Sequence, residues 1–238
     1  MGFFIIEHRK LISTTHPNIA FQLPDSVYQN DLTGLHGFDN TGNCRLWPGG
    51  EALAAYFLHN PEMLYNKSVI ELGAGAFGLP SLIASKYAKN VYITDGNKFS
   101  VDNLNLILKT NNLLENAHSG ALTWQKSCDP HSINSLIDCT FGVVIACDCI
   151  FFEENHHALL DTLDAVMAPD GYSLFCAPNR KGSLEKFLNF VTEDGRYAAT
   201  VDENFEKLLQ QKLVQVTVDH DEIPKLYCLC RKPTSKLR

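Results

Sequence analysis

Short apolar runs alternate with helix-like patterns through the middle of this chain. Strand-like runs lie at residues 69–72, 91–94, 121–124, 141–146 and 172–176. Apolar residues recur at helical spacing between them, for example at Val101, Leu104 and Leu108. Further helix-like segments lie at 52–58, 79–87, 158–167 and 184–191. This alternation predicts βαβ units, and the nearly continuous apolar runs predict a mostly parallel sheet that is buried on both faces.

The two ends of the chain depart from this alternation. The C-terminal part carries strand-like runs and one polar helix pattern, at 197–201, 205–211, 214–218 and 226–230. A turn-like segment at 219–224 separates the last two runs, so we expect the last strands to pair antiparallel. Pro169, Asp170 and Gly171 predict a turn after the preceding helix. We predict an N-terminal extension with a small hairpin at 1–45, packed on a domain at 46–238.

Composition and charge narrow the classes of protein to which this chain can belong. Its 238 residues, with 45% hydrophobic and 20% charged side chains, are typical of one globular domain. The net charge of −7 and the lack of a Lys/Arg run argue against a nucleic-acid partner. No apolar stretch approaches the ~20 residues of a membrane span, and the first residues lack the features of a secretory signal. We therefore expect no membrane association.

Cysteine and histidine spacing gives no sign of a metal site. Eight cysteines occur without a CxxC pair, and the histidines have no partners at ligand spacing. Cys147 and Cys149, like Cys228 and Cys230, are two apart, so that each pair would share a strand face. We interpret the cysteines as reduced thiols, which indicates the cytosol, and also the nucleus, as compartments. The histidines at 156–157 are expected on a helix surface.

The first strand-like run leads into a glycine-rich segment at 71–78. Gly73, Gly75 and Gly78 lie between a predicted strand and a predicted helix, where glycine lets the backbone approach a ligand closely. Their spacing is also that of the GxGxxG segment of dinucleotide-binding proteins. Glu71 precedes the first glycine. Its carboxylate suits a ligand that carries an ammonium and a sulfonium, but it would repel a pyrophosphate.

Two further acids follow predicted strands, at the edge where open α/β sheets bind ligands. Asp95 ends the second run, where a carboxylate accepts the hydroxyls of an adenosine ribose. The alternative role for Asp95 is the N-cap of the helix that starts near Lys98. Asp148 follows the fourth run, and its alternative role is to cap the stretch that starts near Glu153. Trp124 ends the third run, where ligand contact and core packing are equally plausible.

Together these segments resemble the class I S-adenosylmethionine-dependent methyltransferases, and among them the protein lysine methyltransferases called methyltransferase family 16. The resemblance is carried by segments at 37–43, 46–48, 71–78, 94–97, 146–151 and 175–180. It covers residues 35–195. The chain differs from the family pattern at Phe151, where many members have tyrosine. It also differs at Gly49 and Gly50, where members tend to have a serine and an acid.

The resemblance implies a Rossmann-like α/β fold with a seven-stranded, mostly parallel sheet, the last strand antiparallel, and helices on both faces. It implies transfer of methyl groups from S-adenosylmethionine to a protein lysine, leaving S-adenosylhomocysteine, with calmodulin as the leading substrate. It assigns a set of residues to the methyl donor: Trp47, Glu71, Gly73, Gly75, Asp95, Asn97, Trp124 and Cys147. It assigns Asp148 and Phe151 to a lysine channel. There Asp148 would hold or orient the amine, and Phe151 with Phe152 would form a wall.

Other functions stay open at this point. The same chemistry could act on another protein, such as an elongation factor or a chaperone. The glycine segment and Asp95 also suit a nicotinamide-dependent oxidoreductase, and a non-catalytic module could bind the methyl donor without turnover. Asn179 and Arg180 are candidates either for substrate contact or for a surface loop. We expect a monomer.

Overall fold

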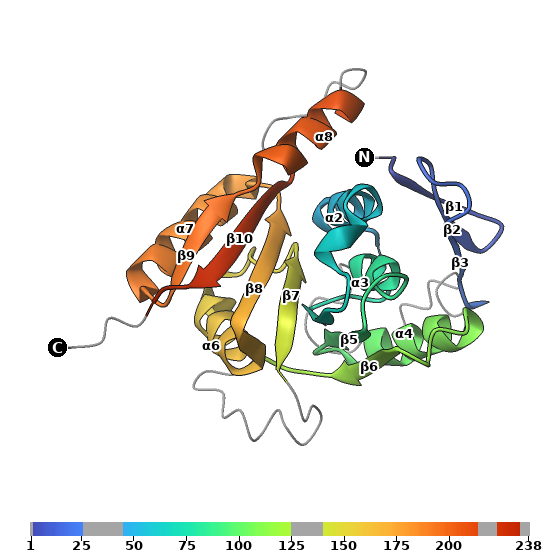
Figure 1. Cartoon of the computed structure of the whole chain (residues 1–238), viewed down its shortest axis with the longest axis horizontal. Coiled ribbons are helices and arrows are strands. Elements are labelled where there is room, and N and C mark those ends of the chain that lie inside the picture. The colour runs from blue at the N-terminus through green and yellow to red at the C-terminus, as the bar shows by residue number, and fades with distance from the viewer. Residues whose placement is uncertain (1, 26–44, 125–139, 214–222, 234–238) are drawn as a thin grey trace.

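A computed structural model describes residues 2–25, 45–124, 140–213 and 223–233. A seven-stranded sheet with the strand order β6-β5-β4-β7-β8-β10-β9 forms the centre of the molecule (Figure 1). Its strands are β4 (Ser68–Leu72), β5 (Asn90–Asp95), β6 (Ala117–Ala121), β7 (Phe141–Cys147), β8 (Met167–Ala177), β9 (Tyr197–Val201) and β10 (Lys225–Arg231). The predicted seven-stranded α/β fold is confirmed.

Strand direction follows the prediction as well. The neighbouring pairs from β6 to β8 are all parallel, whereas β10 runs antiparallel to both β8 and β9. The last strand is therefore the antiparallel one, as expected. Its described partners are β8 and β9, and the run at 214–218, which the sequence offered as a partner, lies outside the described residues. Since β4, β5 and β7 are parallel, their carboxyl ends meet at one edge.

Helices cover both faces of the sheet because the strands alternate their apolar side chains. Val69 packs into one hydrophobic cluster and Ile70 into the other, and the same division separates Val143 from Val144. One face packs against α2 (Pro48–His59), α3 (Leu79–Ala84), α4 (Lys98–Thr110) and α8 (Glu203–Leu213). The other packs against α6 (His156–Val166) and α7 (Ser183–Asp194). The core thus has two layers, and the sheet lies between them.

A small antiparallel sheet precedes the main domain. Its strands are β1 (Phe4–Glu7), β2 (Lys10–Ser13) and β3 (Ala20–Gln22). The predicted hairpin corresponds to the first two, which pair with Ile5 opposite Ile12. The backbone N–H groups of Phe3 and Phe4 donate to Glu51 Oε1 at 2.6 and 3.1 Å, which ties this sheet to α2. Figure 1 shows it at the opposite end of the molecule from β9. The division at residue 45 stays a prediction.

Two local predictions were wrong. The third strand is Ala117–Ala121 instead of the run at 121–124, because β6 is at the sheet edge and only Ala117 of its residues is buried. A strand that is not buried on both faces needs no continuous apolar run. The predicted turn at 169–171 lies inside β8, beside a register irregularity against β7. Phe141 pairs with Met167 and Val143 pairs with Tyr172, so β8 has extra residues between these two pairs. The predicted turn residues lie among them and form a local irregularity of the strand.

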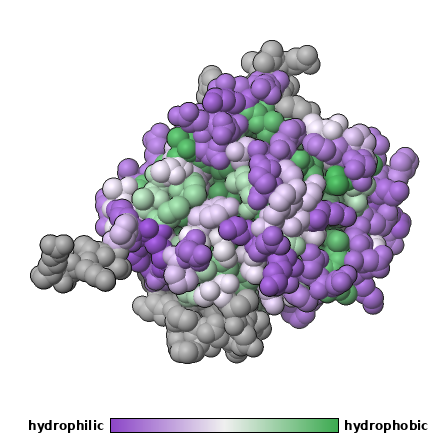
Figure 2. Space-filling model, viewed as in Figure 1, coloured by the Kyte–Doolittle hydropathy of each residue, from purple (hydrophilic) through white to green (hydrophobic). Residues whose placement is uncertain are grey.

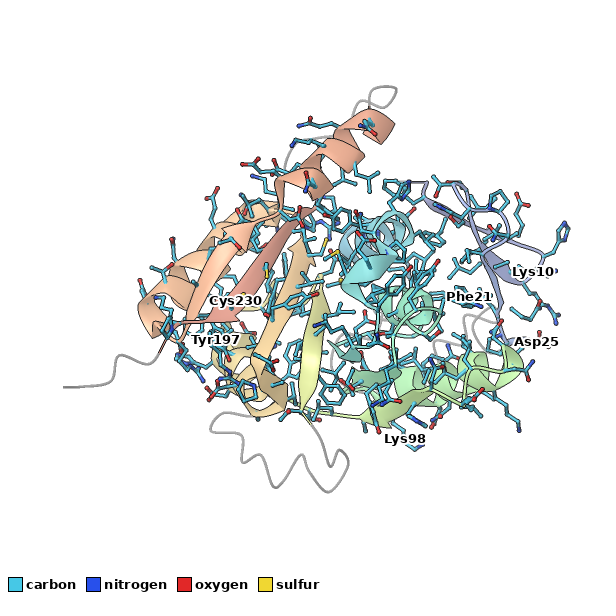
Figure 3. All side chains as sticks on the ribbon, in the orientation of Figure 1. Lys10, Phe21, Asp25, Lys98, Tyr197 and Cys230 are labelled. Carbon is cyan, nitrogen blue, oxygen red and sulfur yellow. The ribbon has the colours of Figure 1, made fainter. Side chains whose placement is uncertain are left out.

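The described cysteines are free thiols. Cys228 and Cys230 share one face of β10, with their sulfur atoms 3.8 Å apart. Figure 3 labels Cys230 on β10 and Tyr197 on the neighbouring strand β9, where Cys230 pairs with Ala198. Cys147 and Cys149 do not form such a pair, since β7 ends at Cys147 and the Cys149 thiol donates to the carbonyl of Leu72 at 3.2 Å. Sequence spacing alone did not show where the strand ends.

The surface of the described part is largely polar. Figure 2 shows hydrophilic side chains over most of the visible face, with hydrophobic residues in scattered patches. None of the described helices is long and apolar enough to span a bilayer.

Candidate functional site

A cavity of about 950 Å³ opens at the carboxyl ends of β4, β5 and β7. Open α/β sheets bind their ligands at this edge, and the volume is at the upper end for small-molecule sites. Ten of the residues singled out in the sequence line the cavity: Trp47, Glu71, Gly73, Gly75, Asp95, Asn97, Trp124, Cys147, Asp148 and Phe151. Gly78, Phe152 and Arg180 line it as well, whereas Asn179 is not among its lining residues. Strand ends that are distant in sequence are thus brought together by the parallel sheet.

The glycine segment turns sharply between β4 and α3. Gly73 has φ +72°, a left-handed conformation that residues with a side chain rarely adopt. A Cβ atom there would lie 2.9 Å from both the Trp124 ring and the Cys149 sulfur. The two side chains therefore pack directly on the glycine backbone. Trp124 lies beyond the true end of β6, yet it still reaches the cavity.

Asp95 holds the glycine segment and the start of α4 together. Its Oδ2 accepts from the Gly75 N–H at 2.8 Å, and its Oδ1 accepts from the Asn97 N–H at 2.8 Å. The alternative role for Asp95 was wrong, because the N-cap of α4 is Asn97, whose side chain accepts from the Phe99 N–H. Each carboxylate oxygen has two acceptor sites, so one on each oxygen remains for ribose hydroxyls. Burial raises the pKa of Asp95, although the two hydrogen bonds from Asn97 and Gly75 act in the opposite direction and lower it.

Glu71 is a buried carboxyl group at the floor of the cavity. It is 2% exposed, and its Oε2 accepts from the Ser81 N–H in α3 at 3.2 Å. Burial raises the pKa of Glu71 to about 7, and the hydrogen bonds from Ser81 only partly oppose this. A buried acid with so high a pKa gains most from a cationic ligand, which would restore its charged form.

Asp148 joins β7 to the start of α2. Its Oδ2 accepts from the N–H groups of Gly49 and Gly50 at 2.8 and 3.2 Å. These N–H groups belong to the first turn of α2 and have no partner within the helix. Trp47 at the N-cap position has no side-chain cap, so Asp148 supplies it. The alternative role for Asp148, as a cap of the stretch near Glu153, was therefore wrong, because Asp148 caps a helix 99 positions earlier.

The close approach of Asp148 explains the glycine at position 49. A Cβ atom on Gly49 would lie 2.5 Å from Asp148 Oδ2 and 2.4 Å from the Cys176 carbonyl oxygen, far inside contact distance. Asp148 itself has φ +53°, a strained conformation for a residue with a side chain. Burial raises the pKa of Asp148 to about 6, opposed first by the positive charge of Arg180.

Two guanidinium groups lie over the ring of Trp47. Arg45 lies 4.4 Å and Arg180 lies 5.3 Å from the Trp47 ring centre, and all three residues line the cavity. The sequence left Arg180 open between substrate contact and a surface loop. It gave no sign of Arg45, because no motif marks that residue. Asn179, which precedes Arg180 in the chain, has a different role. Its side-chain Oδ1 accepts from the Leu184 and Glu185 N–H groups at the start of α7.

Two phenylalanines follow Asp148 at the rim of the cavity. Phe151 and Phe152 are 47% and 40% exposed, and their rings are perpendicular with centres 5.3 Å apart. The turn before them is held by His156, whose Nε2 lies 2.9 Å from the Ile150 carbonyl oxygen. His156 is 3% exposed and packs on Phe187, so its predicted position on the helix surface was wrong. Its partners come from a turn and another helix, which spacing along one helix could not show.

The chemistry of the cavity differs between its ends. Asp95 and Asn97 offer hydrogen-bond acceptors for a sugar at one end, and Glu71 offers a negative charge near the centre. Asp148 lies toward Phe151 at the other end, where the rim is aromatic. This arrangement fits a ligand with an adenosine group and a cationic amino-acid group. Asp148 is left as a separate acidic group for a second, cationic reactant.

Comparisons with known proteins agree with this geometry. The profile of a family described as lysine methyltransferase matches residues 29–194. Calmodulin-lysine N-methyltransferase of Arabidopsis thaliana is 33% identical over 172 residues, which cover 69% of this chain and 55% of that protein. Protein N-terminal and lysine N-methyltransferase EFM7 of Candida glabrata is 33% identical over 162 residues, covering 65% and 62%. The match thus spans less than two thirds of either relative.

The solved structures extend the likeness to the fold. A putative O-methyltransferase from Klebsiella pneumoniae superposes with a TM-score of 0.54 at 12% identity, covering 88% of this chain and 87% of that one. At this identity the likeness concerns the fold alone, and it is that of the class I methyltransferases.

Proposed function

Because the chain belongs to the lysine methyltransferase family, we propose that it transfers the methyl group of S-adenosylmethionine to the ε-amine of a lysine in a protein substrate. The observation that carries the proposal is the single cavity that joins Glu71 and Asp95 to Asp148. The first two suit the methyl donor and the third suits an arriving lysine. A dinucleotide ligand is disfavoured because the carboxylate of the buried Glu71 would repel its pyrophosphate.

The chain's own residues would hold the methyl donor at several points. Asp95 accepts the ribose hydroxyls with the acceptor sites that Gly75 and Asn97 leave open. The Trp124 ring, seated on Gly73, offers a flat apolar surface near the adenosine end. Glu71 binds the ammonium group, which compensates for the cost of its burial. Trp47 closes the cavity from the start of α2.

Asp148 would guide the lysine. Lysine is positively charged at neutral pH, so its ammonium is attracted to this carboxylate on entry. The Oδ2 atom is committed to α2, whereas Oδ1 is buried with no hydrogen-bond partner among the described residues. We assign orientation of the amine to Asp148, since a close carboxylate favours the charged amine and opposes its deprotonation. Phe151 forms the wall beside it.

The bound methyl donor would supply an electrophilic methyl group on a sulfonium. The lysine ammonium first loses one proton to solvent, and the neutral amine then displaces the thioether, so that the products are S-adenosylhomocysteine and a methylated ammonium. The remaining work of the protein is orientation of the two reactants, which is worth about 7–11 kcal/mol in favourable cases. Exclusion of water from the lysine channel lowers the pKa of the amine and so favours its reactive form.

Calmodulin is the substrate that we propose first, and the support is the similarity to the Arabidopsis thaliana enzyme of that name. The second candidate is a different protein, since the EFM7 relative is named for N-terminal and lysine methylation. We further propose that the protein acts in the cytosol, and also in the nucleus, on the strength of the free thiols among the described cysteines. We propose a monomer as well.

The experiment is methyl transfer from labelled S-adenosylmethionine to purified unmethylated calmodulin, with an Asp95→Ala variant as control. We expect label on one lysine, located by mass spectrometry, and none with the variant. Absence of label together with tight binding of S-adenosylhomocysteine would rule out calmodulin but not the enzyme class. Binding of NAD in place of S-adenosylhomocysteine would rule out the class as well.

A further inference from the structure

Two exposed aromatic side chains stand at the mouth of the cavity. Phe151 and Phe152 are 47% and 40% exposed. Among the described residues, six other large apolar side chains are comparably exposed, and none of them lines the cavity: Ile5, Ile6, Tyr65, Leu106, Leu114 and Val201. Exposed aromatic surface is unfavourable in water unless something covers it. The coincidence of this pair with the mouth of the site indicates that its cover is a part of the substrate.

The pair is held in place by its surroundings. Ile150, which precedes it, is buried, and its carbonyl is bound by the buried His156. The carbonyl of Phe152 accepts from the Asn155 N–H at 3.1 Å. Glu153 forms an ion pair of 2.6 Å with Lys186 of α7, which links the segment to a second helix. The rings are therefore presented as a fixed surface, and little conformational entropy would be lost on docking.

The reach of lysine determines which substrate residues would meet this surface. Asp148 and Phe151 together line the cavity and a second, small pocket beside it. A lysine that brings its amine to Asp148 must therefore place its four-carbon stem along Phe151. The substrate backbone then stays outside, at the level of the rim. The residues on either side of the lysine lie next to Phe152 at that level.

We propose that Phe152, together with the outer edge of Phe151, docks an apolar side chain that neighbours the target lysine in the substrate. This inference rests on the proposed function and adds a preference in the substrate to it. The occupant is a lysine-containing segment with a leucine-, isoleucine- or methionine-like side chain beside the lysine. Aromatic rings and such side chains associate by burial of apolar area, and methionine sulfur adds a favourable contact with the ring.

The test uses the full chain and short synthetic peptides with one central lysine, flanked by leucine, by glycine or by glutamate. For the unsubstituted protein we expect KM to be lowest with leucine flanks, by about tenfold relative to glycine, since the exposed part of a phenylalanine becomes buried. Phe152→Ala should remove that difference, whereas the affinity for S-adenosylhomocysteine, which does not depend on the docked side chain, should stay the same. Phe152→Leu should retain most of the difference.

Leu106→Ala is the matched control, because Leu106 is 43% exposed and lies away from the cavity on α4. It should change neither KM nor kcat. Equal KM values for leucine and glycine flanks, or a lower KM with glutamate, would overturn the inference even though methyl transfer proceeds. A loss of S-adenosylhomocysteine affinity in Phe152→Ala would also overturn it, since the residue would then serve the methyl donor. Failure both to methylate any peptide or calmodulin and to bind S-adenosylhomocysteine would instead refute the proposed function, and the inference with it.

Discussion

Replacement of Glu71 by glutamine separates stability from function in this protein. In the ligand-free protein Glu71 is buried with its pKa raised to about 7 from an ordinary value of 4.5. A carboxyl whose pKa is raised on folding binds more protons in the folded than in the unfolded state between these two values. The stability of the unsubstituted protein therefore falls as the pH rises from 4.5 to about 7. Glutamine has no carboxyl proton to lose, so Glu71→Gln avoids this fall.

The size of the effect follows from the same pKa values. The interval from 4.5 to about 7, at about 1.4 kcal/mol per pKa unit, corresponds to about 3 kcal/mol of unfolding free energy above pH 7. At pH 5 the calculated advantage of the glutamine variant is about 1 kcal/mol. The glutamine side-chain oxygen can still accept from the Ser81 N–H, so that hydrogen bond persists. The melting temperature of a chain of this size should rise by about 6–12 °C at pH 8.

The assay is urea unfolding of the ligand-free protein at pH 5 and pH 8, with titration of S-adenosylhomocysteine by calorimetry in parallel. The exposed Glu193→Gln serves as the matched control. Although Glu71→Gln should unfold at higher urea at pH 8, it should bind S-adenosylhomocysteine at least about tenfold more weakly, since the charge opposite the ammonium is gone. In the unsubstituted protein that affinity should rise between pH 6 and pH 8.

Two results would refute this reasoning about Glu71. If the variant is less stable at pH 8, or if its advantage does not grow between pH 5 and pH 8, the free protein must already stabilise the ionised carboxylate. If binding of S-adenosylhomocysteine is unchanged, the carboxylate does not face the ammonium group of the ligand.

Further substitutions test other parts of the cavity. Asp95→Ala should weaken S-adenosylhomocysteine binding by at least about tenfold, measured by calorimetry, because it removes both ribose acceptors and the bond to Gly75. Gly49→Ala should destabilise the protein by about 1–3 kcal/mol in urea unfolding, because its Cβ would lie 2.4 Å from the Cys176 carbonyl; an unchanged midpoint would contradict the packing. The methyl-transfer rate should rise with pH through about 6 as Asp148 ionises. Asp148→Asn should lower kcat and abolish that rise, although its side-chain oxygen can still accept from the start of α2.

Much of the fold was predictable from local pattern. The β4, β5 and β7 strands are buried on both faces, so their sequences are nearly continuous apolar runs that mark them clearly. The edge strand β6 has no such run, since its residues are mostly accessible, and its position was therefore predicted several residues too late. Predictability along this chain depends on how much of each strand is buried.

The candidate site divides in the same way. The order of residues along the chain is enough to show that glycines and acids lie at strand ends, and a parallel sheet must bring such ends together at one edge. The partner of each group, in contrast, follows only from the folded structure. Asp148 accepts from a helix 99 positions away, and the Arg180 guanidinium lies over the Trp47 ring. Both contacts join segments that are far apart in the sequence. Strand periodicity is a property of neighbouring residues, whereas these contacts depend on how the helices pack against the finished sheet.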